Sequence, residues 1–317
     1  MATLQEAASM LKKIGLPGEE SYDLPTSKRR FPDGGWYRLE VSGVERLEVL
    51  ETVVRERNKR NVPIHRLIST VMGATLLDRA ELKDFAQLAA DSEMEVILTP
   101  GPRGTWDTGR EVATPEGKTH GKRHRGVSQL KHVITDIMRA IEIGFRGFLV
   151  YDEGLMWALN KMRENGDIPE DVVFKVSIST GHGSPASGKM LQELGANSFN
   201  PVADLDLPKI SSLRQSIDIP IDIHVYLVES AGGEIRFYET PEFARIASPC
   251  YFKLEPGEAF SKGPGGLYKP WTDISLLNHL AREKVKYAQT IHNIVQKNFP
   301  EAEISNHGAE DLAIPVV

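Results

Sequence analysis

The stretch VVFKVSIST (172–180) is one of eight short apolar runs that recur between residues 36 and 255. Segments of helical character separate the runs, and strands that alternate with helices pair in parallel. Eight such units close into a (β/α)8 barrel. The sequence therefore predicts an α/β fold of the TIM-barrel type, with strands in WYRLEVSG (36–43), IHRLISTVMG (64–73), EVILTPGPRG (95–104), FRGFLVYDEG (145–154), VVFKVSIST (172–180), ANSFNPVAD (196–204), IPIDIHVYLVES (219–230) and CYFKLEPG (250–257).

The chain divides into a barrel and two flanking segments. Residues 1–35 form an N-terminal extension with an amphipathic stretch, which we expect to be a short helix covering the bottom of the barrel. Residues 36–300 form the barrel, and residues 301–317 form a tail that packs irregularly or frays. One-sided apolar spacing predicts helices at 44–61, 76–94, 127–144, 189–195, 207–218 and 275–299.

The connection between the third and fourth runs is the longest. Its residues 104–126 are rich in glycine, threonine and charge, and an insertion directly after a barrel strand lies on the active-site face. We expect a lid in which Trp106 and basic side chains cover an anionic ligand. A surface loop without such a role is the alternative.

Composition excludes several classes of protein. The net charge of −6 argues against a nucleic-acid-binding protein. Because Cys250 is the only cysteine, a disulfide within the chain, a thiolate zinc site and a four-cysteine iron–sulfur cluster are excluded, and a buried, inert thiol is expected. No nucleotide-cofactor motif is evident. No stretch is apolar enough to cross a membrane, so we expect a cytoplasmic protein with no membrane partner. Assembly into a homo-oligomer is left open.

Polar side chains repeat along one face of five of the predicted strands. Alternate residues of a strand point the same way, and this groups Arg38, Glu40 and Ser42; Tyr151 and Glu153; Lys175, Ser177 and Ser179; Asp222, His224 and Tyr226; and Lys253 and Glu255. Burying unpaired charge against apolar helices is expensive. These faces should therefore line the lumen and the mouth of the barrel, where a small-molecule substrate would bind.

One chemistry that fits these residues is metal binding. A divalent ion such as Mn, Co, Zn or Mg could polarise a carbonyl or hydroxyl group. The candidate ligands, together or as a subset, are Glu40, Glu153, His182, His224 and Glu255. The alternative is that they form internal ion pairs with basic residues of the lumen.

Two further chemistries fit as well. A lysine among other charges, such as Lys175 or Lys253, could attack a carbonyl group to form a Schiff base, although it could also simply bind substrate. Glu153 with His182 or His224 could instead transfer a proton. The candidate substrate-binding residues are Arg38, Arg66, Arg103, Tyr151, Asn200, Tyr226, Arg236 and Lys253.

Glycine-rich turns follow the later strands. SAGGE (230–234) and GEAFSKGPGG (257–266) come after the seventh and eighth runs, where barrels often bind phosphate through backbone N–H groups. Turns without a ligand are the alternative. In GHGSPASG (181–188), Ser184 is a candidate cap for the next helix.

Residues 64–256 resemble bacterial U32-type peptidases and peptidase-like barrels in the features GFLVYDEG (147–154), STGHGSPAS (179–187), GANSFNP (195–201) and GGEIRFYE (232–239). The resemblance implies a TIM-type barrel. Several members of this family use a four-cysteine cluster, for example in RNA or quinone hydroxylation. The single cysteine departs from that pattern, so neither cluster chemistry nor RNA modification carries over. No Ser–His or Cys–His protease pattern is present either.

The leading hypothesis is an enzyme that acts on a small, polar, anionic metabolite such as a sugar acid or hydroxy acid. The reaction would be of the lyase, isomerase or aldolase type, with or without a divalent metal. Glu153 and His224 would supply acid–base groups, and Arg38, Lys175 and Lys253 would hold the substrate's charge. A peptidase-like hydrolase is the second hypothesis, and a non-catalytic small-molecule-binding barrel is the third.

Overall fold

The computed structural model describes residues 4–71, 73–109, 111, 114, 117, 120–227, 233–255 and 273–317. All eight predicted runs form strands that pair in parallel. They are β1 (Tyr37–Ser42), β2 (Arg66–Ile68), β3 (Glu95–Leu98), β4 (Gly147–Val150), β5 (Val173–Val176), β6 (Ser198–Phe199), β7 (Ile221–Leu227) and β9 (Cys250–Leu254). Because β6 pairs with β7 and β9 pairs with both β7 and β1, the sheet is closed. The chain is therefore a (β/α)8 TIM barrel, as predicted.

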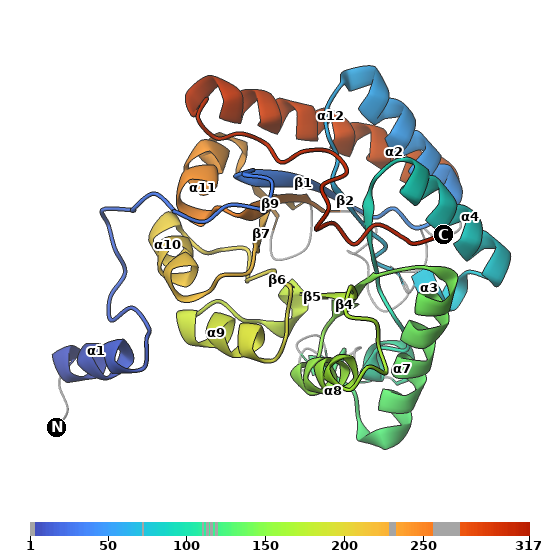
Figure 1. Cartoon of the computed structure of the whole chain (residues 1–317), viewed down its shortest axis with the longest axis horizontal. Coiled ribbons are helices and arrows are strands. Elements are labelled where there is room, and N and C mark those ends of the chain that lie inside the picture. Colours follow the sequence, from blue (N-terminus) through green and yellow to red (C-terminus); the bar gives the residue numbers. More distant parts are fainter. Residues whose placement is uncertain are drawn as a thin grey trace.

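Helices surround the closed sheet in a ring (Figure 1). The ring comprises α2 (Leu47–Arg60), α3 (Gly73–Leu76), α4 (Arg79–Asp91), α7 (Gly126–Ile143), α8 (Glu153–Glu164), α9 (Pro185–Glu193), α10 (Leu207–Ser216), α11 (Thr240–Ala247) and α12 (Ile274–Asn298). All of the predicted helices form, whereas α8 and α11 were not singled out. Ser184 caps α9 as predicted, since its hydroxyl accepts a hydrogen bond from Ser187 N at 3.2 Å.

The strand β8 (Glu234–Ile235) was not expected, and it pairs antiparallel with the end of β7. Nearby, the register of β7 with β9 shifts between His224 and Tyr226. Such a bulge redirects the side chains that follow it. Tyr226 consequently packs against the rings of Phe237 and Tyr287, with ring centres 6.3 and 4.9 Å away. The prediction that Tyr226 shares a face with His224 is therefore wrong.

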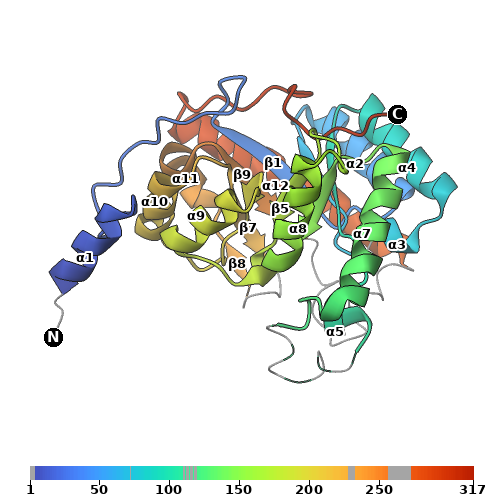
Figure 2. The ribbon, with the colours of Figure 1, turned by 60° about the horizontal axis from the view of Figure 1, so that its bottom comes forward.

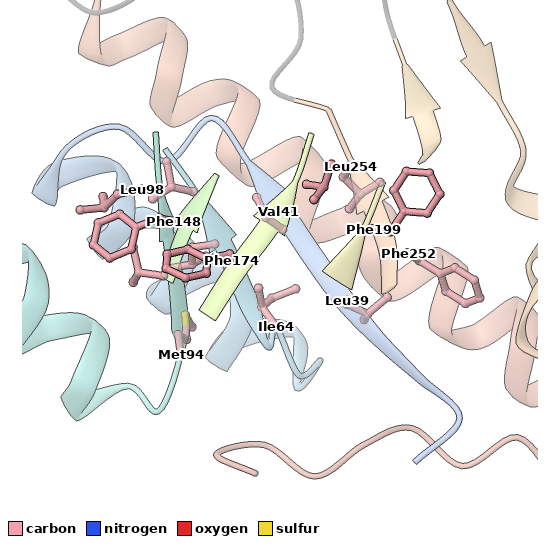
Figure 3. Packing of buried hydrophobic residues seen from close by; sticks show 14 of the residues in the cluster. Leu39, Val41, Ile64, Met94, Leu98, Phe148, Phe174, Phe199, Phe252 and Leu254 are labelled. Atoms are coloured by element: carbon pink, nitrogen blue, oxygen red, sulfur yellow. The ribbon is translucent and has the colours of Figure 1, made fainter. Parts of the chain in front are cut away.

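The main apolar core lies between the outer face of the barrel and the helices. Figure 3 shows Leu39, Val41, Phe148 and Phe174 among its buried members. Burial of each such side chain contributes roughly 1.5–3 kcal/mol. A smaller apolar cluster is formed on the inner side of β2 to β4 by Ile68, Ile97, Leu149 and Tyr151. Polar side chains of the lumen come from the other strands and also from Arg66 of β2 and Glu95 of β3.

The two flanking segments meet at the end of the barrel where the strands begin. The helix α1 (Leu4–Lys13) forms but lies to one side of the barrel (Figures 1 and 2), so the expectation that it covers the bottom is wrong. Phe31 lies there instead, with its ring centre 5.4 Å from that of Tyr251. From the C-terminal tail, Asp311 pairs with Arg38 at 2.6 Å. The tail packs irregularly, and this contact holds it against the barrel.

The structure bears on the expected absence of a membrane-spanning helix and on the state of Cys250. Among the described residues, no helix is long and apolar enough to cross a membrane. Cys250 is buried at the start of β9, and burial raises the pKa of its thiol. That environment fits the predicted inert thiol.

Candidate active site

A network of ion pairs fills the middle of the barrel. Glu40 lies at its centre and contacts Lys253 Nζ at 2.6 Å, Lys175 Nζ at 3.2 Å and Arg66 Nη1 at 3.3 Å. Asp222 pairs with Arg66 at 3.0 Å and also with Lys175. Burial alone would raise the pKa of Glu40, but the three cations hold it below its usual value. Glu40 therefore stays ionised and links its own strand β1 to three others, β2, β5 and β9.

Arg66 extends this network to a third carboxylate. Its Nε lies 2.6 Å from Glu95 Oε2, and its guanidinium lies 3.5 Å from the ring centre of Tyr251. The network thus balances three carboxylates against three cations, namely Glu40, Glu95, Asp222, Arg66, Lys175 and Lys253. Internal ion pairs, the alternative considered for these residues, are what the structure contains. Lys175 is completely enclosed at 0% exposure, so a substrate cannot reach its amine.

At the mouth, two lysines flank the end of β1. Lys253 Nζ donates to Ser42 Oγ at 2.8 Å, and Lys284 of α12 donates to the backbone oxygen of Ser42. Burial lowers the pKa of Lys253 to about 8, and it lowers the pKa of Lys284 to about 7. Glu40 opposes the shift at Lys253, whereas Lys175 adds to it. Near neutral pH, both amines are therefore much closer to their neutral form than an ordinary lysine.

His224 faces the same part of the lumen and is held by Asn200. Asn200 Nδ2 donates to Asp222 O at 2.9 Å and to His224 Nδ1 at 3.1 Å. Because Nδ2 is the donor in both contacts, Nδ1 of His224 must be the acceptor. Burial, and then Lys253, lower the pKa of His224 well below its usual value. The ring is consequently neutral and carries its proton on Nε2.

Glu153 and His182 come together at another part of the mouth. His182 Nε2 donates to Glu153, and Arg123 Nη2 of the insertion donates to the same carboxylate at 3.1 Å. Burial, and then Arg123, lower the pKa of His182. Of the two histidines considered as partners of Glu153, His182 is the one in contact with it. In the described part of the chain, Glu153 and His224 form no hydrogen bond or ion pair with each other, so the pair Glu153–His224 is not formed.

The insertion predicted to be a lid places Lys122 at the mouth. Lys122 Nζ donates to Ser179 Oγ at 2.7 Å, and it lies 4.9 Å from the ring centre of Trp106 and 5.0 Å from that of Tyr151. Burial, and then Arg103, lower the pKa of the half-buried Lys122 to about 7, against the opposing effect of a nearby aspartate. Within the described residues, no carboxylate forms an ion pair with Lys122.

The two ends of the insertion hold each other in place. Trp106 N donates to Gly121 O at 2.8 Å, and this contact joins α5 (Gly104–Asp107) to the returning chain. Figure 2 shows α5 projecting beyond the ring of helices, on the side where β8 lies. Arg103 is buried and donates to Asp107 through Nε at 2.9 Å and Nη2 at 3.0 Å. The charge of Arg103, a predicted substrate-binding residue, is therefore shared with Asp107.

Two other predicted substrate-binding arginines are engaged with other segments of the chain. Arg38 is at the bottom of the barrel, where Asp311 and Ser305 of the tail accept its hydrogen bonds. Arg236 donates to the backbone oxygens of Ala203 and Leu205 at 3.2 and 2.8 Å. Both side chains hold segments of the chain together, so substrate binding by them is not supported. Arg38 was misplaced because strand alternation predicts which way a side chain points but not its depth in the lumen.

The five predicted metal ligands do not converge. Only Glu153 and His182 are in contact, whereas Glu40 lies among lysines in the ion-pair network. Glu255 is buried at the end of β9 and raises the pKa of Lys284. Among the described residues, no three His, Cys, Asp or Glu side chains lie where they could hold a metal ion. A divalent metal remains a prediction, without support from these five residues as a group.

Some predicted features lie outside the described residues. They include all of GEAFSKGPGG (257–266) and most of SAGGE (230–234), the two candidate anion loops.

Two important residues were missed by sequence reasoning. Lys284 lies on the apolar face of α12, between the buried Ala281 and Ala288, and a lysine in such a stripe is a recognisable signal. Glu95 opens its strand, and its alternation with Ile97 could have revealed its inward direction.

Together, the closed sheet and its polar lumen define a (β/α)8 barrel protein with a candidate active site at the mouth. No protein-family model matches the chain, and no curated protein matches it. Solved structures do match. A protein from Coccidioides immitis described as a fructose-1,6-biphosphate aldolase is 11% identical, with a TM-score of 0.50 over 84% of this chain and 92% of that one.

Two further solved structures match the chain at lower TM-scores. The YdjI aldolase from Escherichia coli K12 is 13% identical, with a TM-score of 0.49 over 84% of this chain and 94% of that one. The U32 peptidase Mk0906 is 17% identical, with a TM-score of 0.44 over 75% of this chain and 99% of that one. At 11% identity, the similarity to the Coccidioides immitis protein supports the fold alone. The family remains unassigned, and the U32 resemblance of the sequence motifs remains a prediction.

Proposed function

We propose that the protein is a lyase of the aldolase type that binds a small anionic carbonyl compound and attaches it to Lys253 as a Schiff base. The observation that carries this proposal is the environment of the Lys253 amine. It lies at the mouth, 2.8 Å from Ser42 Oγ and 2.6 Å from a Glu40 oxygen, with a pKa lowered to about 8. A desolvated lysine near other cations is an activated nucleophile.

The residues around Lys253 fit the steps of imine formation. The neutral amine attacks the carbonyl carbon, the electron pair of the C=O bond moves to the oxygen, and one proton passes from the attacking nitrogen to that oxygen. Loss of that oxygen as water, after a second proton reaches it, leaves a protonated imine. The Nε2–H of neutral His224 is suited to stabilise the developing negative charge on the oxygen. The protonated imine then withdraws electrons from an adjacent carbon–carbon bond and so assists its cleavage.

Lys253 is preferred over the two lysines beside it because of its accessibility and its position on the barrel. Lys175 is enclosed between Glu40 and Asp222 at 0% exposure. Lys284 is also buried, and it is engaged with the backbone oxygen of Ser42. The side chain of Lys253 retains 8% exposure at the C-terminal end of β9, which is the face where barrels of this type carry out catalysis.

Borohydride reduction tests this proposal directly. Incubation of the protein with a panel of 2-oxo acids and aldehydes, followed by reduction, should give a mass increase on the peptide that contains Lys253. Lys253→Arg keeps the positive charge beside Glu40 but cannot form an imine, so it should give no adduct. Lys161→Arg, at an exposed ion pair on α8, is the matched control and should be labelled at Lys253 like the wild type. Absence of any adduct on Lys253 across the panel would reject the proposal.

The pH dependence of trapping gives a second, independent prediction. Only the neutral amine attacks, so the rate should rise as the pH increases through about 8, the lowered pKa of Lys253, and then level off. An ordinary lysine would continue to gain reactivity up to its pKa of 10.5. Quenched-flow trapping followed by mass spectrometry measures this profile, with a lysine-containing peptide as the reference. A profile that follows the reference peptide would contradict the assigned environment.

A peptidase-like hydrolase is the second candidate, and the contact of Glu153 with His182 at the mouth favours it. In that case Glu153 would activate water. Cleavage of a peptide library that disappears in Glu153→Gln, without any carbonyl adduct on Lys253, would support the hydrolase over the lyase.

A further inference from the structure

We infer that Lys122, Trp106 and Ser179 form the subsite that binds the oxyanion group of the substrate, a carboxylate or a phosphate. This inference rests on the proposed function, because it names the part of the mouth that recognises the substrate's charge. The subsite lies across the lumen from Lys253. Lys122 is packed over Tyr151 at the end of β4, and β4 is the fourth strand from β9 in either direction around the barrel.

Lys122 carries its charge without an ion-pair partner among the described residues. Its Nζ contacts a hydroxyl group and the faces of two aromatic rings, as described above. Aromatic rings attract an ammonium group but do not neutralise it. Asp107 acts on Lys122 without forming an ion pair with it, and its carboxylate accepts from Arg103; Glu153 likewise accepts from Arg123. An incoming anion is therefore the missing partner of this lysine.

The indole N–H group of Trp106, beside Lys122, is a hydrogen-bond donor without an acceptor in the described part of the structure. Its Nε1 atom is buried. A buried N–H group without an acceptor is rare in folded proteins, because it has lost its hydrogen bonds to water. The Trp106 ring is also the one that Lys122 faces at 4.9 Å. A ligand oxygen near Lys122 could therefore satisfy this N–H group as well.

Lys122, Trp106 and Ser179 all offer hydrogen-bond donors. The ammonium of Lys122 and the indole N–H of Trp106 can only donate hydrogen bonds, and the hydroxyl of Ser179 can also donate. Several donors and one positive charge suit a carboxylate or a phosphate, because charge-assisted hydrogen bonds are the strongest ones. Arg103 adds positive potential nearby and takes part in lowering the pKa of Lys122 to about 7. Binding of an anion should reverse that shift.

Titration with simple anions tests the subsite without any turnover. Wild-type protein is titrated with inorganic phosphate and, separately, with acetate, at a constant ionic strength set with chloride. Tryptophan fluorescence and thermal shift are the readouts. We expect saturable binding of at least one of the two anions, and the one that binds more tightly identifies the substrate group. Lys122→Gln should weaken binding at least tenfold, whereas Lys122→Arg should remain within about threefold of the wild type.

Matched variants show whether the fluorescence change and the anion binding arise at Trp106 and Lys122. Trp106→Phe should abolish the fluorescence change, whereas Trp157→Phe, at an exposed position on α8, should retain it. Lys161→Gln, which removes an exposed lysine, should bind like the wild type. Equal binding by Lys122→Gln and wild type, or no saturable response to either anion, would overturn the inference. If trapping on Lys253 succeeds while both anions fail to bind, the lyase proposal survives and the subsite does not. If an anion binds at Lys122 but no adduct forms on Lys253, the subsite is retained and the lyase proposal is rejected.

Discussion

Replacing Arg66 with methionine should lower the free energy of unfolding by about 3–5 kcal/mol, the largest effect on stability expected in this barrel. Arg66 is 3% exposed and contacts Glu95 at 2.6 Å, Asp222 at 3.0 Å and Glu40 at 3.3 Å. Without it, three buried carboxylates would share the two lysines that remain. Buried charges without partners are costly because they have lost their hydration. Urea-induced unfolding followed by circular dichroism measures the change.

A second substitution shows whether charge balance is the cause. In Arg66→Met with Glu95→Gln, two carboxylates again face two lysines, so the double variant should be more stable than Arg66→Met alone. Lys161→Met removes one partner of an exposed ion pair with Glu164 and should change the free energy of unfolding by less than about 1 kcal/mol. If the double variant is as unstable as the sum of its two single variants, lost packing rather than unbalanced charge explains the effect.

Replacing His224 with alanine should slow formation of the Lys253 adduct by about a hundred- to a thousandfold, because the variant lacks the donor assigned to the developing oxyanion. The neutral state of His224 and its contact with Asn200 at 3.1 Å leave the proton on Nε2. Single-turnover trapping with a carbonyl compound that labels the wild type measures the rate. The final extent of labelling at saturating reagent should remain similar, since Lys253 is still present.

A conservative variant separates catalysis from structure. The amide of His224→Gln can still donate a hydrogen bond, so this variant should recover part of the rate. The pH at which the rate levels off should also move little in either variant, because neutral His224 is not a main determinant of the Lys253 pKa. A His224→Ala variant that forms the adduct at the wild-type rate would remove His224 from the proposed mechanism.

Much of the fold could be predicted from local sequence pattern. The eight apolar runs became the eight parallel strands, even where β6 retains only Ser198 and Phe199 as strand residues. Strand alternation is a short-range property, so the inward direction of Glu40 and Lys253 followed from their neighbours alone. The direction predicted for Tyr226 was wrong because of the bulge after His224. This bulge depends on how β7 pairs with β9, and a local sequence pattern does not contain that information.

The candidate site was only partly predictable, for a related reason. Side chains that point into the lumen lie at different depths along the barrel axis. The depth of each one depends on the stagger between strands that are distant in sequence. Arg38 and Lys253 both point inward, yet one lies at the bottom and the other at the mouth. Lys122 comes from an insertion without regular periodicity. Its contact with Tyr151 depends on how the two ends of that insertion meet.

The pairing of Arg38 with Asp311 has a consequence for how the chain is made. The two residues are 273 positions apart, and Arg38 is 1% exposed in the folded barrel. During synthesis, the first strand leaves the ribosome long before its carboxylate partner exists. Until then, burial of the arginine would leave a cation without a counter-charge. The bottom of the barrel should therefore be completed only after Asp311 has left the ribosome, and nascent chains that stop before Asp311 should remain open at that end.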